Sequence, residues 1–286
     1  MKSLILAVAL VATPGLSQAA GCQAAFGALI DMLVAGDVID EAPTALVRER
    51  PNGWCGVRAL RVKVDRRTNL AIEEFAWRGE DMERFVTGGL PPTALEISAK
   101  GVRTPRHLGD ADLDEEIAMA MLAEGSFDID LSAAWERGAR QLVLEDVRLR
   151  KTSGDELRLN ATIDNIDLTS QATIQMSAGG LALSSASLDV KTEEAFVPFF
   201  KGLGDSGDSA LDEFLARFPA ETLNESSREA LRKLSEHGPI GDLSIGFAAE
   251  GGFSALRFAP FYISGTIPDR AAIWDGVVLD VSFLPR

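Results

Sequence analysis

The sequence predicts an α+β, β-dominated protein in which a curved antiparallel sheet is built from repeated bulged hairpins, with helices covering one face. Three observations support this fold class. Apolar residues alternate at period two over much of the chain, one eight-residue pattern occurs three times, and helical apolar spacing is confined to a few blocks. A sheet with one apolar face needs a second layer, and the helical blocks can supply it.

The repeated pattern is L-x-[LI]-x-x-[AVF]-x-[LW]. It occurs at Leu70–Trp77, Leu142–Leu149 and Leu181–Leu188. The extra residue at its centre shifts the alternation once, as a β-bulge does. We therefore expect bulges at Glu73–Glu74, Glu145–Asp146 and Ser184–Ser185.

Each copy of the pattern follows a shorter alternating run and a polar or Gly-bearing turn. These runs are Leu60/Val62/Val64, Phe127/Ile129/Leu131 and Ala172/Ile174/Met176. Two alternating runs joined by a short turn predict a hairpin. Each copy of the pattern is thus expected to be the second strand of a hairpin.

The first 20 residues have the features of a secretory signal peptide. A short basic segment with Lys2 precedes the apolar run Leu4–Ala12, and small residues allow cleavage near Ala19 or Ala20. The run is shorter than the ~20 residues that a spanning helix needs, and no later stretch reaches that length. The sequence therefore predicts an exported protein without a transmembrane segment, periplasmic or secreted.

Residues 21–56 are expected to form an N-terminal helix, over Ala24–Gly36, and a loop tied down by a disulfide. Cys22 and Cys55 are the two cysteines of the chain, and a pair in an oxidising compartment is expected to form a bond. The alternative is a lipoprotein anchored through Cys22, because Ala20 and Gly21 are the small residues that such a signal needs. Acylation would leave Cys55 as a free thiol, so we favour the disulfide.

Residues 57–286 are predicted to form a β-rich domain with a helical insertion at about 192–238. Before the insertion, besides the first hairpin, we expect the elements Glu80–Val86 (helix), Ala94–Val102 (strand), Asp112–Glu124 (helix), and the strands Phe127–Trp135, Leu142–Leu149, Leu157–Ile163, Ala172–Met176 and Leu181–Val190. From the insertion onwards we expect the helices Glu193–Leu203, Ser209–Phe218 and Ser226–His237, then the strands Leu243–Phe247, Ala255–Phe258 and Gly276–Phe283.

The composition and motifs do not indicate an enzyme. The net charge of −15 disfavours nucleic-acid binding. Gly204–Gly207 resembles the nucleophile loop of trypsin-like proteases, but neither His107 nor His237 lies in a protease-like context. Asp110–Glu116 resembles the start of a calcium loop but lacks the required Gly and final Glu. No catalytic residue, metal site or cofactor is predicted, and two His with two Cys make no zinc set.

A Phe-rich block is the one feature with a functional alternative. Its apolar positions follow helical spacing, so its helices are expected either to cover the sheet as core or to close over a lipid chain. The candidate ligand-binding residues are Phe196, Phe199, Phe200, Phe214 and Phe218.

The strand pattern resembles the repetitive strands of AsmA-like envelope proteins. The resemblance covers roughly residues 57–190 and rests on LAIEEFAW, LVLEDVRLRKTSGDELRLNATIDNIDL and LALSSASLDV. It implies an envelope location and lipid handling in an elongated apolar groove, but no site residue can be carried over. This chain departs from the family in its short length, its cleavable leader and its helical block.

The sequence thus predicts an exported, non-catalytic bacterial envelope protein of the periplasm. Its candidate partners are a lipid or other apolar ligand, held between the sheet and the Phe-rich helices, and another envelope protein. The alternative is a structural or protein-interaction module with a filled core and no ligand.

Overall fold

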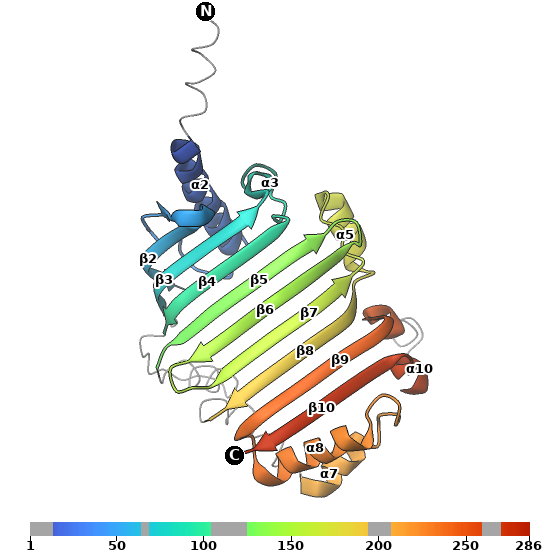
Figure 1. Ribbon diagram of the computed structural model, residues 1–286. Coiled ribbons are helices and arrows are strands. Elements are labelled where there is room, and N and C mark those ends of the chain that lie inside the picture. The colour runs from blue at the N-terminus through green and yellow to red at the C-terminus, as the bar shows by residue number, and fades with distance from the viewer. Residues whose placement is uncertain (1–13, 64–68, 104–124, 194–206, 259–269) are drawn as a thin grey trace, which may run out of the picture. The chain divides into compact units, whose positions relative to one another are not determined.

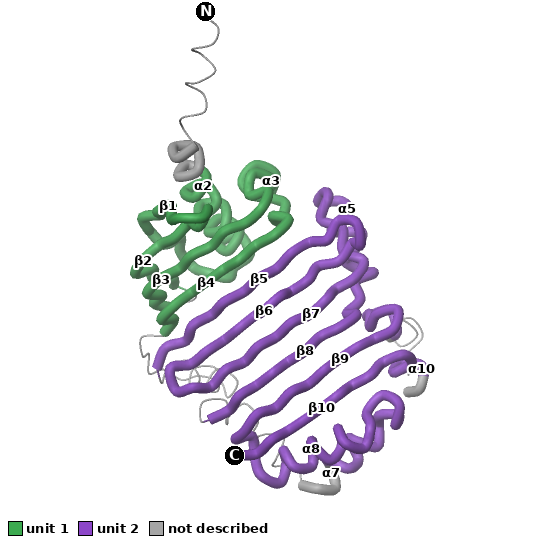
Figure 2. The backbone as a smooth tube through the Cα atoms, viewed as in Figure 1, with its two compact units in different colours: residues 1–109 green, residues 110–286 purple. Residues whose placement is uncertain are grey.

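The computed structural model describes residues 14–63, 69–103, 125–193, 207–258 and 270–286. The chain is β-dominated and its paired strands are antiparallel, which confirms the predicted fold class (Figure 1). It divides into two units, Met1–Gly109 and Asp110–Arg286 (Figure 2). Unit 1 thus contains both the N-terminal helix and the first strands of the predicted β-rich domain, which starts at residue 57.

Unit 1 consists of a long helix and four antiparallel strands in the order β1-β2-β3-β4. Its elements are α2 (Pro14–Ala35), β1 (Arg48–Glu49), the 3-10 helix η1 (Pro51–Gly53), β2 (Cys55–Lys63), β3 (Asn69–Glu80), α3 (Met82–Gly88) and β4 (Ala94–Val102). The predicted first hairpin is β2–β3, and the predicted strand Ala94–Val102 is β4.

The core of unit 1 lies between α2 and the strands. Phe26 and Ile30 of α2 are buried against Val57, Leu60 and Trp77 of β2 and β3. The rings of Phe26 and Trp77 stack with centroids 5.8 Å apart. Burial of each such side chain stabilises the fold by about 1.5–3 kcal/mol.

A disulfide joins α2 to the start of β2. Cys22 and Cys55 are bonded, with their Cα atoms 5.5 Å apart, which confirms the predicted pair. Because α2 has few charged residues, its position over the strands depends on this bond and on the apolar core.

Unit 2 consists of six antiparallel strands in chain order, β5 to β10. Its elements are β5 (Phe127–Glu136), β6 (Gln141–Lys151), β7 (Glu156–Asp164), α5 (Gln171–Ala178), β8 (Ala182–Thr192), α7 (Gly207–Leu215), α8 (Glu225–His237), β9 (Gly241–Ser254), the 3-10 helix η2 (Ala255–Phe258), α10 (Arg270–Trp274) and β10 (Val277–Pro285).

The bulge expected at Glu145–Asp146 is present. In β6 these two residues lie opposite the single residue Asn160 of β7, between the pairs Leu144–Ala161 and Val147–Leu159. Asp146 has φ 55°, and the side chain of Asn160 accepts a hydrogen bond from its N–H at 2.8 Å. The extra residue keeps the apolar positions before and after it on one face.

The bulge expected at Ser184–Ser185 is also present. Ser184 is the extra residue of β8, between the pairs Ile163–Leu183 and Thr162–Ser185. Its hydroxyl donates a hydrogen bond to the carbonyl of Thr162 at 3.1 Å, which joins the bulge to the neighbouring strand β7.

The bulge expected at Glu73–Glu74 is wrong, because β2 and β3 stay in register through this point. The two partner strands, β2 and β4, shift the alternation of their side chains at the same row as β3. Ala59 of β2 has φ 53° and Gly101 of β4 has φ 61°, both at the row of Glu73. Since three neighbouring strands shift their alternation together, no residue is left without a partner row.

Two predicted strands are helical. Ala172–Met176 lies in α5, and Ser170 caps this helix by accepting a hydrogen bond from the N–H of Thr173. The third copy of the pattern, in β8, therefore pairs with β7 instead of forming a hairpin with Ala172–Met176. Ala255–Phe258 is the 3-10 helix η2. The predicted helix Asp112–Glu124 lies outside the described residues. So does the predicted helix Glu193–Leu203, except for Glu193.

The described helices of the insertion lie along the edge strand β10 rather than over the middle of the sheet (Figure 1). The hydroxyl of Ser227 in α8 accepts from the N–H of Val281 at 2.9 Å and donates to the carbonyl of Leu279 at 3.4 Å. The N–H of Leu279 donates to the carbonyl of Thr222 at 2.7 Å. The insertion therefore satisfies backbone groups that an edge strand would expose.

Candidate functional site

One face of the unit 2 sheet is polar, and its charges alternate across neighbouring strands. Directly paired residues share a face, so the row Asp128, Arg150, Glu156, Lys191, Asp242 crosses β5 to β9 with alternating sign. Opposite charges on adjacent strands stabilise this register, and a slip by one residue would remove all of them from the row.

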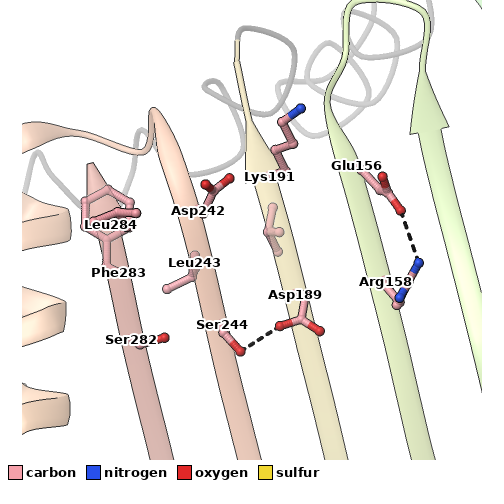
Figure 3. Close-up of a pocket in the computed structure, with 11 residues that line it drawn as sticks. Glu156, Arg158, Asp189, Lys191, Asp242, Leu243, Ser244, Ser282, Phe283 and Leu284 are labelled. Atoms are coloured by element: carbon pink, nitrogen blue, oxygen red, sulfur yellow. Dashed lines mark hydrogen bonds and ion pairs between the residues drawn. The ribbon is translucent and has the colours of Figure 1, made fainter. Parts of the chain in front are cut away.

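A shallow pocket of about 580 Å³ lies on this polar face (Figure 3). Its charged residues already have partners: Arg158 contacts Asp146 at 3.1 Å and Glu156 at 3.7 Å, and Ser244 donates to Asp189 at 2.6 Å. A ligand would have to displace these pairs, so the polar face is better explained as a solvated surface that sets the register.

The C-terminal residue belongs to the same network. Arg286 donates to both carboxylate oxygens of Asp242, at 2.7 and 3.0 Å, and contacts Glu193 at 3.0 Å. The hydrogen bonds to Asp242 are the main cause that raises the pKa of Arg286 above its ordinary value. This pairing ties the end of β10 to β9 and to the residue that follows β8.

The opposite face of unit 2 is apolar, and its rows differ in burial. In one row Val190, Leu243 and Phe283 are buried. In the next row Leu159, Leu188 and Ile245 are half-buried. The first row is buried only on β8 to β10, because its residue on β7, Leu157, is half-buried like the next row.

An aromatic column leads from the insertion to this apolar face. Ring centroids are 5.2 Å apart for Phe214–Phe218, 4.8 Å for Phe218–Trp274, 5.7 Å for Trp274–Phe253 and 6.0 Å for Phe253–Phe247. Phe247 follows Ile245 by two residues in β9, so both lie on the apolar face. Phe214, at the other end, is 49% exposed.

The aromatic column contains two of the five candidate ligand-binding residues. Phe214 and Phe218 belong to it, whereas Phe196, Phe199 and Phe200 lie outside the described residues. Sequence reasoning missed Phe247, Phe253 and Trp274. The segment after β9 is held by Arg257, whose guanidinium lies 5.2 Å from the centre of the Phe253 ring. The same guanidinium donates to the carbonyls of Gly252, Ile273 and Asp275.

Unit 1 has a cleft of about 420 Å³ between α2 and α3. The disulfide, Trp77, Met82 and Val86 line it, together with small residues of α2. Gly79 is required beside it, because a Cβ there would approach the sulfur of Met82 to 2.6 Å and the carbonyl of Ala94 to 2.9 Å. The cleft is apolar, and its wall is part of the core that holds α2.

Of the motifs weighed for catalysis, the described ranges contain only His237 and Gly207. His237 lies at the end of α8, where its Nδ1 is 3.0 Å from the carbonyl of Lys233, as a helix-terminal His often is. His107 and the Gly204–Gly207 loop (apart from Gly207) lie outside the described residues. Within the described ranges there is no group of three His, Cys, Asp or Glu that could hold a metal ion, and no helix long and apolar enough to span a membrane.

Comparisons with known proteins do not assign the chain to a family. No protein-family model matches it, and no curated protein is significantly similar to it. The resemblance to AsmA-like strands therefore stays a prediction.

Proposed function

We propose that this chain is an exported, non-catalytic protein of the bacterial envelope that holds a lipid chain or another apolar ligand on the apolar face of unit 2. The observation that carries the proposal is the half-buried row Leu159, Leu188 and Ile245, beside the aromatic column that ends at Phe247. The ligand-binding region is thus wider than the Phe-rich helices that the sequence indicated.

The energetic argument is the incomplete cover of these aliphatic side chains. Apolar area removed from water stabilises a complex by about 25 cal/mol per Å². A ligand lying along Leu188 and Ile245 would gain this energy from the area of these side chains that is still exposed. The rings of Phe247 and Phe253 meet edge-to-face, at 86°, and offer an apolar wall at one end of the row.

The disulfide and the predicted leader support the proposed compartment. Disulfides persist in oxidising environments such as the periplasm, and Cys22–Cys55 is compatible with that location. The lipoprotein alternative requires an acyl thioether on the sulfur of Cys22. The same sulfur forms the disulfide, so we favour a cleaved leader and a protein without a lipid anchor.

The alternative function is a structural or protein-interaction module of the envelope with no ligand. It predicts that the protein purified from its native envelope carries no lipid. The paired charges of the polar face are compatible with both functions. The two functions differ in whether the apolar face binds a ligand.

Mass spectrometry of lipids extracted from the natively purified protein tests the proposal. We expect a stoichiometric apolar ligand on the wild type and its loss from Ile245→Ser. Ser244→Ala, one residue away on the polar face, is the matched control and should retain the ligand. A wild-type protein without ligand, or equal retention by both variants, would favour the interaction module.

A further inference from the structure

A lysine, Lys151, lies on the apolar face of unit 2, at the end of β6. Side chains alternate along β6 after its bulge, so Lys151 points to the same side as Leu149 and Val147. These two residues pair with Leu157 and Leu159 of β7, which belong to the apolar face. The arginines between them point to the polar face. A positive charge therefore stands at one end of an otherwise apolar stripe.

The burial of Lys151 is unusual for a lysine. Only 9% of the residue is exposed, although Leu149, two positions nearer the middle of the strand, is half-buried. A lysine is almost never buried to this extent unless its charge is paired. Its ammonium lies 5.8 Å from the centre of the ring of Phe127, the residue opposite it in β5. The ring attracts the charge but offers no lone pair to the three N–H donors.

The described part of the chain supplies no anion to this ammonium. No hydrogen bond or ion pair joins its Nζ to another residue of the described ranges. The buried acid nearest in the sequence, Asp155, has its carboxylate engaged elsewhere. It accepts from the hydroxyl of Ser153 at 2.6 Å and from the N–H of Glu193 at 3.0 Å. The Nζ is also not one of the fully enclosed side-chain atoms that lack a hydrogen bond, so a ligand can reach it.

We infer that Lys151 binds the anionic head group of a ligand whose apolar chain lies along the stripe beside it. This inference rests on the function proposed above and adds the class of ligand, which is a single-chain amphiphile with a carboxylate or phosphate head. An oxyanion would accept charge-assisted hydrogen bonds from the ammonium. The chain would cover the half-buried Leu149 and Leu157.

The length of the stripe agrees with an acyl chain. Lys151 and Thr192 each lie one residue beyond the polar row described above, so they share the next row. Phe247, at the far end of the stripe, pairs with Ala186. Six residues of strand separate Ala186 from Thr192, which corresponds to about 20 Å. One acyl chain spans half of the ~30 Å hydrocarbon core of a bilayer, about 15 Å, and therefore fits between the ammonium and the Phe247 ring.

The test measures binding of three ligands with the same alkyl chain and different head groups. The probes are laurate, dodecyl phosphate and the uncharged 1-dodecanol, titrated calorimetrically into the whole disulfide-bonded protein after removal of copurified lipid. We expect at least one of the two anions to bind about tenfold more tightly than 1-dodecanol. The tighter of the two anions identifies the head group. Lys151→Met keeps the apolar stem, so it should abolish this preference and leave the affinity for 1-dodecanol unchanged.

Two further variants separate the head group from the chain. Lys191→Met is the matched control, because Lys191 lies on the polar face and its Nζ is 3.2 Å from Glu193. It should bind all three ligands as the wild type does. Leu149→Ser should weaken all three ligands by the same several-fold factor, since Leu149 contacts only the chain. Unchanged binding of 1-dodecanol to Lys151→Met shows that the variant has kept its fold.

The failure of this inference can be distinguished from failure of the proposed function. If none of the three ligands binds the wild type, both are contradicted. If all three bind equally well, or if Lys151→Met keeps the preference for an anion, the apolar site stands and Lys151 is only a lysine with a hydrated tip. An equal loss of preference in Lys191→Met would also overturn the inference, because it would show a general effect of charge.

Discussion

The two units use similar strands but differ in charge and in how their apolar side chains are covered. Of the 28 Lys and Arg residues 13 lie in Met1–Gly109, with 12 of the 43 Asp and Glu, so unit 1 has a net charge of +1 and unit 2 of −16. In unit 1 Phe26 and Trp77 are buried in a core cluster, whereas the apolar face of unit 2 is half-buried at Leu188 and Ile245.

This difference teaches that one strand pattern can serve two purposes. In unit 1 the apolar side of β2 and β3 is covered by α2 and fastened by a disulfide, which makes it a stable base. In unit 2 the described helices of the insertion protect the edge strand, and the ligand that we propose would lie on the apolar face. Substitutions at matched positions in the two units should therefore have different consequences.

The largest expected effect is on the core of unit 1. Phe26 is 4% exposed, so Phe26→Ala should lower the free energy of unfolding by about 3–5 kcal/mol. Phe214→Ala, at a residue that is 49% exposed in unit 2, should cost about 1 kcal/mol or less. Urea unfolding followed by Trp fluorescence measures both, and equal costs would contradict the contrast in burial.

Loss of the disulfide should have an effect of similar size, confined to unit 1. Cys22 and Cys55 are separated by 33 residues, so the double substitution to Ser should cost about 3–4 kcal/mol in the chain-entropy model. Hydrogen exchange should then speed up in α2 and β2 and stay unchanged in β5 to β8. Equal acceleration in both units would mean that they do not differ in what stabilises them.

The edge of unit 2 should depend on one hydroxyl. Ser227→Ala leaves the N–H of Val281 without its acceptor, and we expect a cost of about 1–3 kcal/mol. Faster hydrogen exchange in β10 would report it. Ser226→Ala is the control, because Ser226 is exposed and its hydroxyl bonds only to Asn224 among the described contacts, so its effect should stay within about 0.5 kcal/mol.

The smallest effect is expected on the polar face. Lys191→Glu places a carboxylate between those of Glu156 and Asp242, which should cost about 0.2–1 kcal/mol at low salt. High salt should remove most of the difference, since these groups are partly exposed. A loss of stability that does not respond to salt would indicate a packing role for Lys191 instead.

Much of this fold could be predicted from alternation alone, and the exceptions have physical reasons. The bulges at Asp146 and Ser184 follow from the shifted alternation in β6 and β8, where the neighbouring strand does not shift. At Glu73 the alternation also shifts in the partner strands, at Ala59 and Gly101, so no bulge results. The sequence of one strand does not reveal with which residues it pairs. Ala172–Met176 alternates by coincidence, and the capping pair Ser170 and Thr173 was the missed signal for a helix.

The candidate site was harder to predict because it is assembled from distant segments. Phe214 and Phe218 were recognised from their helical spacing. Their contact with Trp274 and Phe253 depends on where the insertion meets β9 and α10, which no local pattern encodes. The half-buried state of Ile245 likewise depends on what covers the sheet, and its strand pattern is the same as that of a fully buried residue.

Fluorescence quenching by a brominated fatty acid tests the central claim most directly, because the four Trp residues are divided between the units. Trp54 and Trp77 belong to unit 1, and Trp135 and Trp274 to unit 2. In variants that keep a single Trp, we expect saturable quenching of Trp274, beside the apolar face, and none of Trp77, which is 4% exposed and lines the cleft of unit 1. Quenching of Trp77 alone, or of neither residue, would contradict a ligand site on unit 2.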